Sequence, residues 1–394
     1  MPRGKRTQLI AAIEKKRNSK VIAYVTSDRP GMAALIAGDV VSLLHEHILA
    51  LDPKERKTLD LFLYSRGGAS DVPWAVVSMF REYCVEGSFS VLLPYRAHSA
   101  ATLIALGADE IVMTKKAELG PIDITIQTGP YNPTDSKTNQ RLPLSVEDVT
   151  GYFGLVERVG CERPEEKLQA FDRLASQVHP LALGNVNRLL EQTKLVALRL
   201  LETRAGPFPE EENRGIVDHL SSKIYSHSHA IHRTEATNRL GLRQIVKSED
   251  AGIDTDLWDL YKEYRELFSL EEFFLPEQHL IAHGLEEHTW SGLNLACIES
   301  AARLDTCRKD LRVRRLRQVP PQVQLNVNIA QVGIPPLPGV APEQLASLVQ
   351  QLLNQIMPPI INSAAQQSVN EFLKVLPSAG FELIDLNAGW VQEG

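Results

Sequence analysis

Two junctions in this chain carry residues that could do chemistry. Tyr64-Ser65-Arg66-Gly67-Gly68 ends one apolar run, and Ala97-His98-Ser99-Ala100-Ala101 ends another. A junction between a strand and a helix can place a serine hydroxyl beside backbone N–H groups. A nucleophile next to such an oxyanion hole is the minimum equipment for acyl transfer.

The glycine pair lies between a predicted strand and a predicted helix. Residues 59–64 form a short apolar run of the kind found in buried strands, and apolar residues recur at helical spacing over 72–83. Gly67 and Gly68 let the backbone turn sharply, and their amides near a helix N-terminus favour an anion. An ordinary glycine turn is the alternative interpretation.

Ser99 opens an alanine-rich helix predicted over 99–106, after a strand predicted over 88–93. Its hydroxyl has two interpretations: an N-cap that accepts a hydrogen bond from the helix, or a nucleophile. The chain lacks G-x-S-x-G, so the nucleophile elbow of the α/β-hydrolases is not the pattern here.

The surrounding pattern predicts an α/β fold. Alternating strands and helices from 20 to 113 indicate βαβ crossovers on a mainly parallel sheet. Further helices are predicted over 5–18, 39–51, 146–204 and 254–267, strand-like runs at 293–298 and 313–316, Pro-rich segments at 319–321 and 334–339, and an apolar helical stripe over 342–357.

Composition restricts the class of protein. The 394 residues are 43% hydrophobic and 23% charged, which is typical of a soluble globular protein. A net charge of −7 argues against bulk nucleic-acid binding. No signal-peptide pattern and no apolar run long enough to span a bilayer occurs. Four scattered cysteines without C-x-x-C spacing indicate a reduced, cytoplasmic protein.

The two junctions together resemble the Clp-protease and crotonase-like superfamily. Within it, Ser99–Met113 followed by Leu119-Gly120-Pro121-Ile122-Asp123 is similar to the serine dehydrogenase proteinase family, and signal peptide peptidase A is a more distant relative. The resemblance covers residues 20–160, with a weaker echo over 225–242. It implies a Clp/crotonase-like core with a mainly parallel sheet and flanking helices, and the residue patterns after about residue 250 add an α+β C-terminal region.

This resemblance also implies a division of the chain and a set of roles. Residues 1–19 would form an N-terminal helix, 20–245 the Clp/crotonase-like protease domain, and 246–394 a C-terminal region of unknown role. Ser99 would be the nucleophile, and the amides of Gly68 and Ala100, with the adjacent Gly67, would form the oxyanion hole.

The general base departs from the patterns of the related families. Clp-type peptidases have a histidine on the loop after the next strand, where this chain has Asp123. The membrane-protease relatives have a lysine before the following helix, and Lys137 is the lysine that comes nearest to that place. We expect Asp123 to orient Lys137 as the base, with His98, Lys115, Lys116 and the distal histidines as other candidates.

The leading hypothesis is a cytoplasmic serine peptidase that acts on peptides or proteins as a homo-oligomer, without a cofactor or metal. Because the chain has no Walker A pattern, any ATPase would be a separate partner. One alternative is a weakly active or inactive Clp-like binding or assembly module. Another is an acyl-CoA-type hydratase or hydrolase, which uses the same fold and oxyanion logic without a serine nucleophile.

Three groups of histidines do not match a metal motif. In His45-Glu46-His47, successive helix residues cannot both face one ion. The pair His283 and His288 misses the inverted zincin spacing by one residue. His227 and His229 would share a face of an extended strand, which favours a structural role or a contact near an active site.

Overall fold

The computed structural model describes residues 3–85, 87–122, 125–126, 129–224, 229–318 and 376–393, and Ser347 by itself. Asp123, His227, the Pro-rich segments and, apart from Ser347, the stripe predicted at 342–357 lie outside the described residues.

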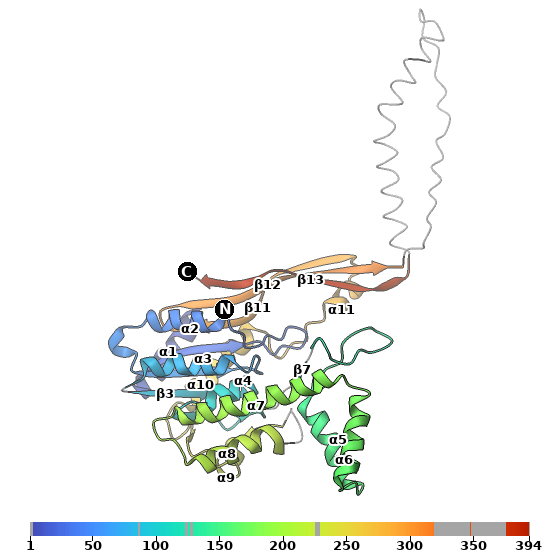
Figure 1. Ribbon diagram of the computed structural model, residues 1–394. Helices are drawn as coiled ribbons and strands as arrows, with labels where there is room; N and C mark the ends of the chain where they lie inside the picture. The colour runs from blue at the N-terminus through green and yellow to red at the C-terminus, as the bar shows by residue number, and fades with distance from the viewer. Residues whose placement is uncertain are drawn as a thin grey trace, which may run out of the picture. The chain divides into compact units, whose positions relative to one another are not determined.

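Helices and strands alternate through the first part of the chain (Figure 1). The helices are α1 Arg3–Arg17, α2 Val40–Leu49, α3 Val72–Tyr83, α4 Ala100–Leu106, α5 Val146–Arg158, α6 Pro164–Ala175, α7 Pro180–Glu202, α8 Glu210–Asp218, α9 Arg233–Asn238, α10 Asp254–Leu267 and α11 Pro276–Ala282, with short helical turns at Pro53–Glu55 and His219–Lys223. The strands are β1 Lys20–Thr26, β2 Thr58–Tyr64, β3 Ser88–Leu93, β4 Arg96–Ala97, β5 Glu110–Met113, β6 Glu118–Leu119, β7 Thr125–Ile126, β8 Leu144–Ser145, β9 Ile231–His232, β10 Ile245–Lys247, β11 Glu287–Glu299, β12 Leu304–Arg317 and β13 Ser378–Glu393.

The main sheet confirms the predicted α/β class. Its strand order is β10-β5-β3-β2-β1-β11-β12-β13. The five strands from β10 to β1 are parallel to their neighbours, whereas β11 pairs with β1 in the antiparallel direction. Strands β4, β6 and β9 form a separate small sheet in that order, and β4 ends two residues before Ser99. Parallel pairing places the carboxyl ends of β2 and β3 at one edge, and both junctions follow those ends.

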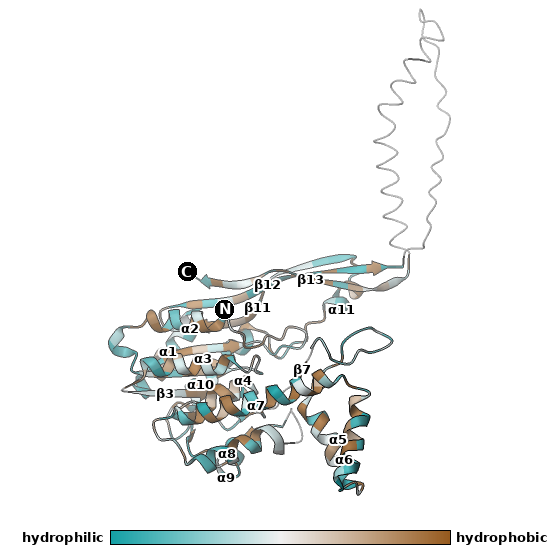
Figure 2. Cartoon of the chain, in the orientation of Figure 1, coloured by the Kyte–Doolittle hydropathy of each residue, from teal (hydrophilic) through white to brown (hydrophobic). Residues whose placement is uncertain are grey.

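Helices cover both faces of the parallel strands. On β1, Val21, Ala23 and Val25 pack with α1 and α10, whereas Ile22 and Tyr24 pack with the helices of the opposite face. This alternation follows from the two-residue period of a strand. Both faces are buried, so β1 and β2 read as continuous apolar runs in the sequence. Figure 2 shows the apolar strands between helices with more polar outer surfaces.

The chain divides into two compact units. The first contains residues 1–274, 294–309 and 388–394, and the second contains residues 275–293 and 310–387. The first unit holds both junctions, the parallel strands and helices α1 to α10. None of the helices in the described ranges is long and apolar enough to cross a membrane.

Most predicted elements are present with shifted ends. Within the stretch 146–204 predicted as helical, helix α7 begins at Pro180, because proline fits the first helical turn and the His179 side chain accepts a hydrogen bond from the Leu181 amide. Helix α5 begins with a capping box between Ser145 and Asp148.

Candidate active site

The two junctions lie side by side because the backbone beyond β2 and β3 continues to pair. The amide of Ser65 donates to the carbonyl of Arg96 at 3.0 Å, and the amide of His98 donates to the carbonyl of Ser65 at 3.1 Å. Ser65 and Ala97 form a parallel bridge. These bonds bring the turn at Gly67 beside the turn at Ser99.

Ser99 has a backbone conformation that is rare for a residue with a side chain. Its φ of 50° and ψ of −115° lie at the turn into α4, and its side chain makes no capping hydrogen bond to that helix. Such strain costs roughly 1–3 kcal/mol and persists where the surrounding structure enforces it, often at active sites. The N-cap interpretation of the Ser99 hydroxyl is therefore disfavoured.

Gly67 packs directly against this turn. A Cβ built on Gly67 would lie 2.7 Å from Cβ of Ser99, 2.6 Å from the carbonyl oxygen of His98 and 3.1 Å from the amide nitrogen of Ala100. Its φ of +102° also favours glycine. Gly67 is therefore required by a close approach of two backbones as well as by the turn itself.

A third segment, around Ile36, holds the glycine turn in place. The Ile36 amide donates to the Gly67 carbonyl at 2.8 Å, and the Ala69 amide donates to the Ile36 carbonyl at 2.9 Å. A Cβ on Gly68 would lie 2.1 Å from the Ile36 carbonyl oxygen, so no side chain fits there. The Gly68 backbone is thus fixed from both directions.

The amides at the two turns differ in their partners. The Gly67 amide donates to Oγ of Ser65 at 3.1 Å, and that oxygen also accepts a hydrogen bond from Thr26. The amides of Gly68 and Ala100 donate to no group among the described residues. Amides without a partner are suited to hold an oxyanion, whereas the Gly67 amide is already engaged by Ser65.

A polar network supports the second turn. Nε2 of His98 lies 3.1 Å from Oε1 of Glu118, and Nε of Arg96 lies 3.2 Å from the same oxygen. Burial raises the pKa of the Glu118 carboxyl, but the hydrogen bond and charge of His98, together with Arg96, outweigh burial and leave this pKa below its ordinary value. Gly120 makes room for the His98 ring, since a Cβ there would lie 2.8 Å from Cγ of His98.

Glu118 and a second carboxylate of this region, Asp28, carry no signal in the sequence that points to these contacts. Asp28 accepts hydrogen bonds from the Tyr64 hydroxyl at 2.7 Å, from Arg96 at 2.8 Å and from Arg66 at 3.1 Å. Asp28 lies in the segment that follows β1, and no spacing in the sequence connects it to residue 96. The carboxylates of Asp28 and Glu118 therefore hold side chains of the two junctions from separate segments of the chain.

The candidate bases lie in different environments. His98 is engaged with Glu118, Lys115 lies 3.7 Å from Glu249, and the Lys116 ammonium lies over the ring of Tyr95 at 4.4 Å. Lys137 is exposed. Within the described ranges no side chain forms a hydrogen bond with the Ser99 hydroxyl.

The distal histidines are also partly described. His229 pairs with Glu235 at 3.2 Å, and the Nδ1 atom of His232 lies 3.4 Å from the Ala117 carbonyl oxygen. His232 is next in the chain to α9 and belongs to β9, which pairs with β6. The segment 225–242, which gave the weaker family resemblance, therefore contributes strand β9 to the small sheet that also contains β4.

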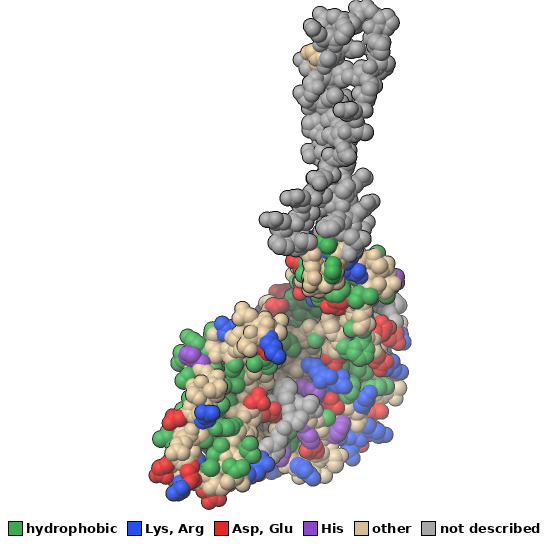
Figure 3. Space-filling view, turned by 90° about the vertical axis from the view of Figure 1, so that its right-hand side faces the viewer, with side chains coloured by type: hydrophobic (Ala, Val, Ile, Leu, Met, Phe, Trp, Pro, Cys, Tyr) green, Lys and Arg blue, Asp and Glu red, His purple; other side chains and the backbone are tan. Residues whose placement is uncertain are grey.

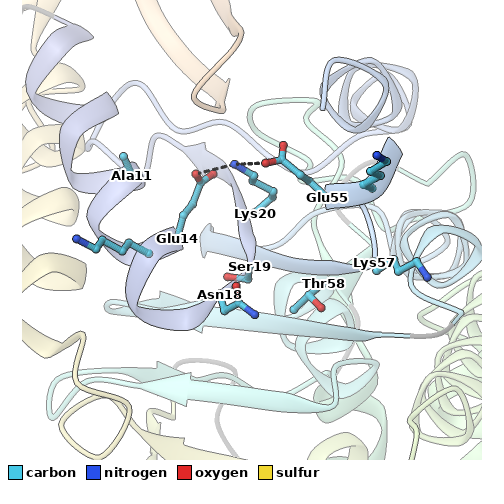
Figure 4. Close-up of a pocket in the computed structure, with 10 residues that line it drawn as sticks. Ala11, Glu14, Asn18, Ser19, Lys20, Glu55, Lys57 and Thr58 are labelled. Atoms are coloured by element: carbon cyan, nitrogen blue, oxygen red, sulfur yellow. Dashed lines mark hydrogen bonds and ion pairs between the residues drawn. The ribbon is translucent and has the colours of Figure 1, made fainter. Parts of the chain in front are cut away.

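Two surface pockets lie in contrasting places. One, of about 470 Å³, lies at the amino ends of β1 and β2, at the opposite edge of the sheet from Gly67 and Ser99; in it Lys20 is ion-paired with Glu14 and Glu55 (Figure 4). The other, of about 650 Å³, lies between α5 and the segment 221–224. Ile122 donates to the carbonyl of Leu220, which joins this second pocket to the Gly120 turn.

Two solved structures, both of the 1510-N membrane-bound stomatin-specific protease, are similar to this chain. One is a serine-to-alanine mutant, and the other is a lysine-to-alanine mutant in complex with a substrate peptide. Both are 14% identical and cover 58% of this chain, and 80% and 75% of their own chains, at TM-scores of 0.32 and 0.33.

Two uncharacterized proteins of Methanocaldococcus jannaschii are 29% and 30% identical over 126 and 123 residues, each alignment covering 30% of this chain. The chain spans 41% and 42% of the length of these relatives. Residues 3–153 match the family described as ClpP-like SDH-type serine proteinase. Over that range, the match confirms the resemblance to the serine dehydrogenase proteinase family that the motifs around Gly67 and Ser99 indicated.

Proposed function

We propose that this protein is a serine peptidase in which Ser99 is the nucleophile. The observation that carries the proposal is the strained, uncapped turn at Ser99, packed against Gly67 beside two amides without described acceptors. Because the Ser99 side chain makes no capping hydrogen bond to α4, its hydroxyl is not engaged by the helix that follows it. The family match to residues 3–153 supports the same chemistry.

In this mechanism the Ser99 oxygen attacks the carbonyl carbon of the scissile peptide bond and gives its proton to a base. The carbonyl oxygen becomes an oxyanion, held by the amides of Gly68 and Ala100. Collapse of the tetrahedral intermediate breaks the C–N bond, and the amine leaves with the proton. Water then hydrolyses the acyl-enzyme by the same steps in reverse order. We propose Lys137 as the base and Asp123 as the group that orients it.

The pocket beside α5 is our candidate for the substrate groove. Gly151 and Gly154 open part of its α5 wall, Glu147, Glu157 and Arg158 line the same wall with charged side chains, and Val146 and Ile224 contribute apolar surface. The Ile122 amide donates to the carbonyl of Leu220, the residue before the lining residue Ser221.

We also propose that the protein forms homo-oligomers in a reducing compartment, the cytoplasm. Helix α6 has no buried residue, and Leu155, Val159, Leu168 and Phe171 of the α5–α6 pair are 44–69% exposed. Large exposed apolar side chains gathered on one pair of helices are typical of a contact surface.

All four cysteines are free thiols, as expected in a reducing compartment. Charged side chains of both signs are interspersed on the face drawn in Figure 3, which is unlike a nucleic-acid-binding surface.

Labelling with a fluorophosphonate probe, followed by peptide mapping, tests the peptidase proposal. We expect the probe to label Ser99, and Ser99→Ala to abolish labelling while the protein stays folded. Ser42→Ala, at an exposed serine of α2, is the matched control and should label normally. Labelling of another serine would overturn the assignment. Absence of labelling in folded protein would favour a binding or assembly module, and coenzyme A-dependent turnover without labelling would favour an acyl-CoA enzyme.

A further inference from the structure

One arginine side chain connects the two junctions. Arg96 lies on β4, three residues before Ser99. Its Nη1 atom donates to Oδ2 of Asp28 at 2.8 Å, and its Nε atom donates to Oε1 of Glu118 at 3.2 Å. The guanidinium therefore bridges two carboxylates, one from the segment after β1 and one from β6.

Each of these carboxylates also holds a side chain next to one of the two turns. Asp28 accepts a hydrogen bond from Nε of Arg66 at 3.1 Å, and Arg66 directly precedes the glycine pair. Nε2 of His98 lies 3.1 Å from Oε1 of Glu118, and His98 directly precedes the proposed nucleophile. A continuous chain of side-chain hydrogen bonds thus runs from Arg66 to His98, with Arg96 at its centre.

This chain reaches beyond the backbone pairing of the junctions. The backbone pairing ends at Ser65, whose amide binds the carbonyl of Arg96 and whose carbonyl binds the amide of His98. Among the described residues, no backbone hydrogen bond joins Gly67 to Ser99, although the two turns pack closely. The side-chain bridge therefore adds a tie immediately before each turn, where the backbone leaves the paired strands.

The Arg96 guanidinium is held in one orientation. Its Nη2 atom donates to the Tyr95 hydroxyl at 2.7 Å, its Cζ atom lies 4.2 Å from the centre of the Tyr95 ring, and that ring packs edge-on against Tyr261 of α10. The side chains of Asp28 and Glu118 are only 5% and 11% exposed, so solvent screens their pairs with Arg96 less than it screens pairs at a free surface. A planar fork of donors can serve two carboxylates at once, which a single ammonium does not do as well.

We propose that Arg96 is a positioning residue for catalysis, an inference that rests on the proposed role of Ser99 as the nucleophile. Arg96 acts through Asp28 and Glu118, and it sets the separation between the Ser99 hydroxyl and the Gly68 amide. The oxyanion develops only as the serine oxygen bonds to the substrate carbon. An error in this separation therefore slows the chemical step and leaves the initial binding of substrate unchanged.

Saturation kinetics of the fluorophosphonate probe test this role, because they separate the maximal labelling rate from the probe concentration at half saturation. In Arg96→Met we expect the maximal rate to fall about 10- to 100-fold at an unchanged half-saturating concentration. Arg96→Lys should not restore the rate, because an ammonium does not reproduce the fork. Both variants should fold, since Asp28 keeps two other donors and Glu118 keeps His98, and circular dichroism verifies it.

Arg81→Met is the matched control. Arg81 also pairs with a partly buried carboxylate, that of Asp109 at 2.7 Å, but this pair lies at the amino end of β5, at the opposite edge of the sheet from Ser99. The control variant should lose stability while each folded molecule keeps the wild-type maximal rate. A purely structural role for Arg96 would give the same result as this control.

Glu118→Gln tests the bridge from its other end. Because Glu118 and Arg96 belong to one chain of contacts, the double variant should be little slower than the slower single variant. A wild-type maximal rate in Arg96→Met, or effects of the two substitutions that multiply, would overturn the positioning role and leave Ser99 as the nucleophile. If the wild-type protein is not labelled at Ser99, the proposed function fails, and the role of Arg96 fails with it.

Discussion

Gly67 and Ser99 are in such close contact that their positions are mutually dependent. A Cβ atom added at Gly67 would lie only 2.7 Å from Cβ of Ser99, and the carbonyl oxygen of His98 fills the rest of that space. The Gly67 carbonyl is in turn held by the Ile36 amide at 2.8 Å. The Ser99 turn therefore occupies the space that a side chain at residue 67 would need, and any side chain there must displace the turn.

Gly67→Ala should separate the two turns. Its Cβ would overlap Ser99, and its φ of +102° is unfavourable for alanine, so we expect a loss of more than about 1 kcal/mol of stability. A displacement of the nucleophile should lower kcat/KM by about 100-fold. Denaturant unfolding and probe-labelling rates measure both effects. Gly215→Ala is the control, since its Cβ meets nothing within 4 Å on the exposed side of α8. Equal labelling rates in Gly67→Ala and Gly215→Ala would show that the contact between Gly67 and Ser99 does not position the nucleophile.

Ser99→Gly should stabilise the protein while it abolishes labelling. Glycine accepts the φ of 50° that strains serine, so relief of about 1–3 kcal/mol of strain should exceed the entropic cost of about 0.5–1 kcal/mol. Ser99→Ala keeps the strain and removes the hydroxyl alone. Denaturant unfolding of the two variants isolates the backbone term. If Ser99→Gly proves less stable than Ser99→Ala, the turn stores no strain.

The core and the two junctions were predictable because their signals are local. Apolar runs identify β1, β2 and β3, and Gly67-Gly68 and Ser99 interrupt them where parallel strands end. The support for the site was not predictable. Asp28 and Glu118 reach Arg96 from separate segments, and hydrogen bonds between distant side chains leave no period in a sequence. The backbone hydrogen bonds between Ile36 and the glycine turn also join segments far apart in the chain and leave no pattern in the sequence.

A buried histidine outside the site predicts how stability depends on pH. Burial lowers the pKa of His47 to about 4, although the charge of Asp305 acts to raise it. Oδ2 of Asp305 lies 3.0 Å from Nε2 of His47, and the Ser300 hydroxyl lies 3.0 Å from Nδ1. The unfolded chain takes up a proton below a pKa of about 6.5, but the folded chain does so only near 4. Stability should therefore fall as pH falls from 6.5 to 4, by about 3 kcal/mol.

His47→Gln tests that assignment, because glutamine does not titrate. Denaturant unfolding at a series of pH values should show a flatter dependence in the variant between 6.5 and 4. His45→Gln is the control, since His45 lies on the same helix, is half-buried and bonds the Tyr83 hydroxyl; it should keep the wild-type slope. Parallel curves for wild type and His47→Gln would show that His47 is not the group responsible.

The exposed apolar side chains of α5 and α6 predict self-association. Light scattering at micromolar concentration should give a mass above the 43.8 kDa of one chain. Leu168→Glu combined with Phe171→Glu should lower that mass, because charges would have to be buried in the contact. Val85→Glu, at an apolar residue exposed in the turn after α3, should leave it unchanged. A stable monomer of the wild-type chain would count against the proposal.

The base is tested by the two residues proposed for it. Lys137 lies in a turn in which Oδ1 of Asp135 accepts hydrogen bonds from the amides of residues 137 and 138, each at 2.8 Å. These two bonds order the backbone of the turn, and the Lys137 side chain is exposed. If Lys137 accepts the Ser99 proton, Lys137→Ala should slow labelling by about 100-fold or more.

Lys137→Arg should not restore the rate, because a guanidinium does not lose its proton near neutrality. Asp123→Asn should slow labelling as well if Asp123 orients the lysine. Lys15→Ala, at an exposed lysine of α1 beside the pocket at the amino ends of β1 and β2, is the control and should label at the wild-type rate. Should Lys137→Ala and Asp123→Asn both label normally, the pairing is wrong, and His229 and His232, at the start and end of the segment that contains β9, become the next residues to substitute.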